Sequence, residues 1–148
     1  TLVIRKLFGT LSNKRLAIFG FSFKANTNDT RESPSIEICK NLLEEGAKIS
    51  IYDPKVEKSQ IQSEFSKFSG NSFNKSWNMA GSVYEAVSEV DALIFLTEWE
   101  EFSNLNYEII SEAMNIPKWI FDTRNIVEYK KIKDYGFKLW KLGEGIST

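Results

Sequence analysis

The chain alternates short apolar runs with amphipathic segments. Runs rich in Ile, Leu, Val and Phe, bounded by turn residues, predict buried strands. We expect strands at residues 15–19, 48–52, 92–96, 119–122 and 137–141, with a weaker candidate at 75–78. Regular alternation of such strands with helical segments favours parallel strands joined by right-handed crossovers.

The clearest helix is predicted at residues 34–45. Ser33 suits the N-cap, Pro34 suits the first helical position, and Gly46 suits the residue just past the end. Further helical segments are expected at 1–8, 83–88, 107–114 and 126–135, and a short helix followed by a surface loop at 59–76. Together these elements predict an α/β fold: a Rossmann-like, doubly wound, mainly parallel sheet of five to six strands with helices on both faces, in three layers.

The composition predicts one globular domain. The chain has 148 residues, of which 42% are hydrophobic and 26% charged, and its net charge is -1. This charge balance argues against a broad nucleic-acid-binding face. No signal peptide and no apolar run of membrane-spanning length are visible, so we expect a soluble, cytoplasmic protein without membrane or nucleic-acid partners.

The chain contains no histidine and a single cysteine, Cys39. This excludes imidazole acid–base chemistry, His- or Cys-based metal sites and an internal disulfide. Cys39 falls on the apolar face of the helix at 34–45, where burial raises a thiol pKa and makes a nucleophilic role improbable. We therefore assign no catalytic residue and no metal ligand.

Residues 20–34 form the most informative segment, because they place cations directly after a buried strand. In open α/β sheets, ligands bind at the carboxyl ends of the strands. Lys24 could supply a flexible point charge there, and Arg31 a planar fork for paired phosphate oxygens. The alternatives are that Lys24 is simply solvated and that Arg31 pairs with Asp29 or Glu32.

The first strand-to-helix junction lacks the glycine fingerprint of dinucleotide-binding domains. Only Gly20 is present where GxGxxG would be expected. Asp53 occupies the strand end at which such domains place a ribose-binding carboxylate. Without the glycine turn, we favour Asp53 as a strand terminator whose side chain caps the following loop.

Two further strand ends carry candidate ligand groups. Arg124 follows the strand at 119–122 and could reach the same sheet edge as Lys24, unless it simply pairs with Asp122. Trp99 could stack on a flat ring, although a tryptophan at a strand end more often packs in the core.

Three blocks of sequence carry a resemblance to a known family. They are GFSFKANTNDTRESPSIEICKNLLEEGAKISIYDPKV, DALIFLTEWEEF and IFDTRNI, in this order. They resemble the C-terminal domain of the UDP-glucose 6-dehydrogenase family. The narrower match to UDP-glucose rests on Thr97-Glu98-Trp99 followed by Phe102. Relatives that act on UDP-N-acetylmannosamine or GDP-mannose share the Phe23-Lys24 element but tend to differ at the Thr97 block.

The resemblance implies a function for a longer protein. Such enzymes oxidise the C6 alcohol of UDP-glucose to a carboxylate in two NAD-dependent steps, on a cysteine of an N-terminal domain, and form homo-oligomers through a central domain. Neither domain is expected in this chain. Residues 1–13 would end the interdomain helix, and residues 14–148 would form the UDP-binding domain. The alternatives are the same domain of a UDP-N-acetylmannosamine or GDP-mannose dehydrogenase, or a stand-alone nucleotide-binding module.

The resemblance also implies site residues. Phe23, Lys24 and Arg124 match positions that contact the UDP-sugar, and Arg31 matches one that reaches the NAD across the interdomain cleft. Thr123 departs from the pattern, because many relatives have glycine there. A β-branched residue resists positive φ, so we expect the loop before Arg124 to differ locally.

Overall fold

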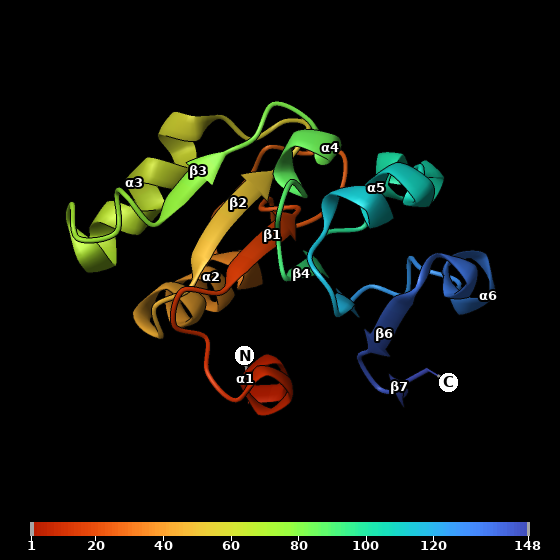
Figure 1. Cartoon of the computed structure of the whole chain (residues 1–148). Coiled ribbons are helices and arrows are strands. Elements are labelled where there is room, and N and C mark those ends of the chain that lie inside the picture. Colours follow the sequence, from red (N-terminus) through yellow and green to blue (C-terminus); the bar gives the residue numbers. More distant parts are fainter. Residues whose placement is uncertain (1, 148) are drawn as a thin grey trace.

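The computed structural model describes residues 2–147 and contains one twisted sheet flanked by helices (Figure 1). The sheet has seven strands in the order β3-β2-β1-β4-β5-β6-β7. Strands β1 to β6 pair in parallel, and β7 pairs with β6 in antiparallel fashion. The strands are β1 (Arg15–Phe19), β2 (Lys48–Tyr52), β3 (Trp77–Met79), β4 (Ala92–Phe95), β5 (Lys118–Asp122), β6 (Phe137–Lys141) and β7 (Gly145–Ile146).

Helices cover both faces of the sheet, and alternate residues of each strand supply the two cores. On β1, Leu16 and Ile18 join one hydrophobic cluster, whereas Ala17 and Phe19 join the other. The first cluster contains residues of α1 (Leu2–Phe8), α2 (Pro34–Glu44) and α3 (Lys58–Ser69). The second contains residues of α4 (Val83–Ala86), η1 (Glu100–Asn104), α5 (Tyr107–Ala113) and α6 (Tyr129–Ile132), which is followed by η2 (Lys133–Tyr135).

The predicted fold class is confirmed. Several helix and strand ends shift by one or two residues, and the larger differences concern three elements. The sheet has one strand more than expected, because the two-residue β7 is too short to show a hydrophobic period. Helix α3 has 12 residues and is not short. Helix α6 begins at Tyr129 rather than at residue 126, because Asp122 Oδ2 accepts the backbone N–H groups of Ile126 and Val127 (both 2.8 Å) in a turn before the helix. Thr1 of the predicted N-terminal helix lies outside the described residues.

Helix α2 begins as its sequence predicts. Ser33 has an extended backbone, and its Oγ accepts a hydrogen bond from the Ser35 N–H (3.2 Å). The same Oγ donates to the Phe21 carbonyl oxygen (2.9 Å), so the helix start is tied to the loop after β1. Within residues 2–147, no helix has the length and apolar character needed to cross a membrane.

Candidate ligand-binding site at the carboxyl edge of the sheet

The loops that carry the candidate cations leave the same edge of the sheet. Strand β4 lies between β1 and β5, and all three strands run in parallel. The loop with Lys24 follows β1, and Arg124 follows β5. Two strand spacings separate these strand ends by about 10 Å. The edge can therefore present both cations to one ligand of nucleotide size.

Asp53 fixes the backbone at the start of the β1 loop. Asp53 is 3% exposed, and its Oδ2 accepts the N–H groups of Phe21 (2.8 Å) and Ser22 (3.1 Å). Oδ2 also accepts the indole N–H of Trp99 (3.3 Å). Oδ1 caps the next loop by accepting the N–H groups of Lys55 (2.9 Å) and Val56 (3.1 Å). The expected capping role is confirmed, and the carboxylate additionally binds a second loop.

Hydroxyl groups bind the carbonyl oxygens of the same segment. The pairs are Ser35 Oγ to Gly20 O (3.4 Å), Ser33 Oγ to Phe21 O (2.9 Å) and Thr97 Oγ1 to Ser22 O (3.0 Å). The Gly20 N–H donates to the Tyr52 carbonyl (2.8 Å), so every backbone polar group of residues 20–22 has a partner. A fully paired backbone makes this segment a rigid platform for the residues that follow.

Gly20 allows the β4 loop to approach this platform. Its φ is +98°, and a Cβ atom built there would lie 2.4 Å from the Thr97 side chain. Any side chain at this position would therefore displace the Thr97 hydroxyl from Ser22. The glycine serves a contact between two loops and not a phosphate turn.

Phe23 and Lys24 follow the platform at the surface. Phe23 is 48% exposed, and its N–H donates to the Asp29 carbonyl (2.7 Å). Ser22 Oγ donates to the Lys24 carbonyl (2.9 Å). The Lys24 side chain is exposed and forms no ion pair within residues 2–147. The backbone of both residues is held while their side chains remain accessible.

Arg31 forms an ion pair with Asp29, which is one of the two partners that the sequence suggested. Its Nε and Nη2 donate to the two carboxylate oxygens at 3.0 and 3.1 Å. These hydrogen bonds lower the pKa of Asp29 and raise that of Arg31. The Arg31 side chain is 86% exposed, and such surface pairs contribute little to stability.

Arg124 is held by the loop after β4. Its Nε donates to the Leu96 carbonyl (3.0 Å) and lies 3.5 Å from Glu98 Oε2. Asp122 accepts only the backbone N–H of Arg124 (3.0 Å), so the ionic partner is Glu98 and not Asp122. Holding the guanidinium through Nε leaves its two terminal nitrogens, which are the pair best placed to bind an anion in bidentate fashion.

Thr123 fits this loop without strain. Its φ is not positive, and the residue of this loop with a positive φ is Asn125 (φ 57°). The Thr123 hydroxyl donates to the Phe95 carbonyl (2.6 Å). Asparagine tolerates positive φ better than a β-branched residue does.

A cavity of about 350 Å³ lies beside Arg124. Among the described residues that line it, Arg124 carries the only charge and Thr123 adds a hydroxyl. The remaining walls are largely apolar and include Ile4, Pro34, Leu96, Phe121 and Trp140. An apolar cavity with one convergent cation is typical of small-molecule sites.

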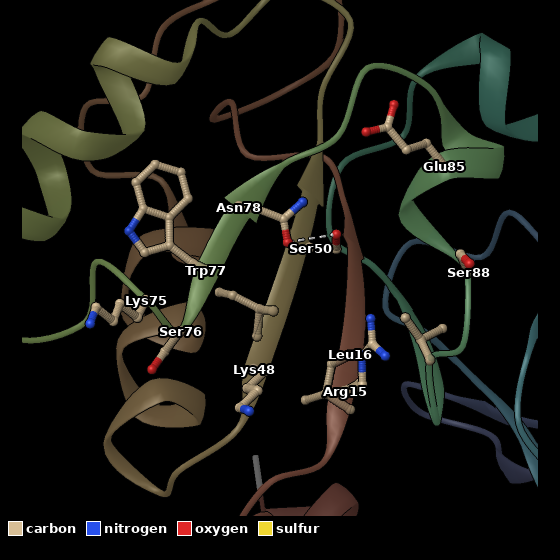
Figure 2. A pocket seen from close by; sticks show the side chains of 12 residues that line it. Arg15, Leu16, Lys48, Ser50, Lys75, Ser76, Trp77, Asn78, Glu85 and Ser88 are labelled. Atoms are coloured by element: carbon tan, nitrogen blue, oxygen red, sulfur yellow. Dashed lines mark hydrogen bonds between the residues drawn. The ribbon is translucent and has the colours of Figure 1, made fainter.

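A second cavity of about 440 Å³ lies over β1, β2 and β3, near the amino ends of the strands (Figure 2). Its walls include Arg15, Lys48 and Lys75, and Ser50 Oγ bonds to Asn78 Oδ1 (3.1 Å) across it. Arg15 is paired with Glu89 (3.3 Å). None of the predicted site residues Phe23, Lys24, Arg31 and Arg124 lines this cavity, so we place the candidate site at the carboxyl edge.

Trp99 and Cys39 are core residues, as predicted. Trp99 is 6% exposed and belongs to the second hydrophobic cluster. Cys39 is fully buried, which raises the pKa of its thiol. Residues 2–147 contain no group of three or more His, Cys, Asp or Glu side chains placed to hold a metal ion.

The sequence reasoning assigned no role to Thr97, Glu98 or Ser35 individually. Thr97 and Glu98 bridge the two cation-bearing loops, because Thr97 binds Ser22 and Glu98 faces Arg124. In the sequence, Thr97 and Glu98 could have been found by their position directly after the apolar run at residues 92–96.

The fold defines a Rossmann-like domain that carries Lys24 and Arg124 at the carboxyl ends of its central strands. The model of the UDP binding domain of the UDP-glucose/GDP-mannose dehydrogenase family matches residues 17–129. The chain belongs to this family.

Curated relatives match over almost the whole chain. UDP-glucose 6-dehydrogenase 4 of Arabidopsis thaliana is 40% identical over 154 aligned residues, covering 96% of this chain and 32% of the relative. UDP-glucose 6-dehydrogenase of Caenorhabditis elegans is 42% identical over 142 residues, covering 95% and 30%. The chain thus spans about a third of the length of these relatives.

Solved structures share the fold. A UDP-glucose dehydrogenase from Pyrobaculum islandicum superimposes with a TM-score of 0.69 at 23% identity, covering 95% of this chain and 27% of that one. An NDP-N-acetyl-D-galactosaminuronic acid dehydrogenase from Methanosarcina mazei superimposes with a TM-score of 0.76 at 20% identity, covering 97% of this chain and 28% of that one.

Proposed function

We propose that this chain is the UDP-sugar-binding domain of an NAD-dependent UDP-glucose 6-dehydrogenase, which oxidises UDP-glucose to UDP-glucuronate in two steps. The observation that carries the proposal is the convergence of the Lys24 and Arg124 loops at one sheet edge, joined through the β4 loop. Identity of about 40% to proteins named UDP-glucose 6-dehydrogenase supports the choice of substrate.

The length comparison supports the presence of further domains in the proposed enzyme. Relatives of this chain are about three times as long, which leaves room for an N-terminal NAD-binding domain with the catalytic cysteine and a central domain for homo-oligomer formation. Residues 1–13 would end the helix that joins the domains, and residues 14–148 would bind UDP. A cytoplasmic location is part of the same proposal.

Phe23, Lys24 and Arg124 would contact the UDP-sugar. The Lys24 ammonium and the terminal nitrogens of Arg124 suit the oxygens of a pyrophosphate. The partly exposed ring of Phe23 and the apolar walls beside Arg124 would shield the uncharged parts of the ligand from water.

The described residues could supply only a small part of an NAD-binding site. The glycine fingerprint is absent, and Asp53 is occupied by backbone N–H groups, so neither ribose nor pyrophosphate has a complete site here. Arg31, on an exposed loop, would supply one cationic contact across the cleft. When bound, NAD would accept the hydride, and this chain would contribute orientation and charge.

Substrate preference tests the proposal. The complete enzyme should form NADH from UDP-glucose with a higher kcat/KM than from UDP-N-acetylmannosamine or GDP-mannose. The 148-residue chain alone should form none, because its one thiol is buried. A preference for another nucleotide sugar would favour the alternative enzymes. Turnover by the chain alone, lost in Cys39→Ser, would refute the proposal.

Arg31→Ala should raise the KM for NAD about tenfold in the complete enzyme, because one charge-assisted contact is lost, and leave the affinity for UDP nearly unchanged. Asp29→Asn is the matched control, since it removes the ionic partner of Arg31 but keeps a side-chain acceptor for the backbone. If both variants raise the KM for NAD equally, Arg31 acts through the ion pair. Weakened UDP binding in Arg31→Ala alone would place it in the nucleotide-sugar pocket.

A further inference from the structure

Asp53 joins three loops through one carboxylate. It directly follows β2 and accepts five N–H groups: two from the loop after β1, two from its own loop, and one from the indole of Trp99 in the loop after β4. The partners of Oδ2 in the β1 loop lie 31 and 32 residues away in sequence. Capping its own loop requires only Oδ1, so local structure does not explain the contacts of Oδ2.

The contacts of Oδ2 fall where the ligand-binding loop needs support. Phe21 and Ser22 immediately precede Phe23 and Lys24, and their N–H groups have no acceptor other than Asp53 among the described residues. Ser22 carries the restraint forward, because its Oγ holds the Lys24 carbonyl (2.9 Å). The path from Asp53 to Lys24 therefore consists of two hydrogen-bonded steps.

Burial makes this support sensitive to charge. Asp53 is 3% exposed, and a buried carboxylate surrounded by N–H donors forms charge-assisted hydrogen bonds. An amide of the same size has one oxygen and one NH2 group. In either orientation of an asparagine side chain, its NH2 group would face the backbone N–H groups of one of the two loops. Its single oxygen would face those of the other loop without a negative charge.

We propose that Asp53 is a positioning residue that sets the affinity of the UDP-sugar site by holding the loop that carries Phe23 and Lys24. The proposal rests on the proposed function. Asp53 does not contact the ligand itself, and it acts through the backbone of Phe21 and Ser22. This positioning role adds to the capping of its own loop by Oδ1.

The test is a double-mutant cycle with UDP titrated calorimetrically into the complete enzyme. Asp53→Asn should raise the UDP dissociation constant roughly tenfold, because charged hydrogen bonds to the loop are lost. In a Lys24→Ala background the same substitution should raise it no more than about threefold, since the group being positioned is gone. Equal effects in both backgrounds, or an unchanged dissociation constant in a folded Asp53→Asn protein, would overturn the proposal.

Asp122→Asn is the matched control. Asp122 is also a buried carboxylate at a strand end, but its acceptors serve the Arg124 loop. The increase in the UDP dissociation constant caused by Asp122→Asn should be the same in the Lys24→Ala background and smaller in an Arg124→Ala background. A melting temperature for each variant separates unfolding from mispositioning. If wild-type enzyme fails to bind UDP, the proposed function fails. If Lys24→Ala weakens binding and Asp53→Asn does not, only the positioning role fails.

Discussion

Replacing Lys24 or Arg124 by alanine in the complete enzyme is expected to weaken UDP binding by about 10- to 150-fold each. A charge-assisted hydrogen bond contributes roughly 1.5–3 kcal/mol, which converts to this range. The effect of Arg124 should fall in the upper part, because its Nε is fixed by the Leu96 carbonyl and its side chain is only 34% exposed. Isothermal titration calorimetry with UDP measures both variants directly.

Lys48→Ala provides the control for general electrostatics. It removes the same charge as Lys24→Ala but lies at the start of β2, at the opposite edge of the sheet. Its UDP dissociation constant should stay within about twofold of wild type, because exposed charges more than a Debye length apart are largely screened. Unchanged affinity in both Lys24→Ala and Arg124→Ala would refute the placement of the site. Loss in Lys24→Ala alone would show that the Thr123 loop holds Arg124 away from the ligand.

Phe95→Ala is expected to destabilise the protein by about 3–5 kcal/mol. Phe95 is fully buried on β4, opposite Phe19 in the strand register, with ring centroids 5.4 Å apart in an edge-to-face arrangement. Phe102 packs against both rings. Truncation would open a cavity at the centre of this cluster, and the melting temperature should fall by roughly 6–20 °C.

Phe23→Ala is the matched control for that change. It deletes the same side chain, but Phe23 is 48% exposed, so the free energy of unfolding should change by no more than about 0.5 kcal/mol. Chemical denaturation followed by circular dichroism measures both. A small effect of Phe95→Ala would mean that the cluster relaxes around the deletion or that the second core contributes less than its burial indicates.

Local patterns in the sequence were sufficient to predict most helices and strands and some of their ends. The continuous apolar run at residues 16–19 predicts a buried strand, and Ser33-Pro34 marks the start of α2. The same reasoning could not find β7, because two residues do not define a period.

The contacts that build the site lie beyond local patterns. Arg124 binds a carbonyl 28 residues away, and the Thr97 hydroxyl binds one 75 residues away. These pairs depend on strand order and register, which place β4 between β1 and β5. The sequence showed that polar residues follow apolar strands, and only the topology determines which of them meet.

The lone thiol of Cys39 can serve as a chemical reporter of conformational opening. It lies fully buried in α2, so an alkylating reagent cannot reach its sulfur while the helix is packed. Burial also raises the pKa of the thiol, which keeps it in the unreactive protonated form. Because α2 starts at the hydroxyls that bind residues 20 and 21, modification would require the helix to separate from that loop and the sheet. In the complete enzyme, which would carry further thiols, the alkylation rate of Cys39 can be followed on its own peptide by mass spectrometry. Rates measured with and without UDP would show how far ligand binding suppresses this opening, without any engineered label.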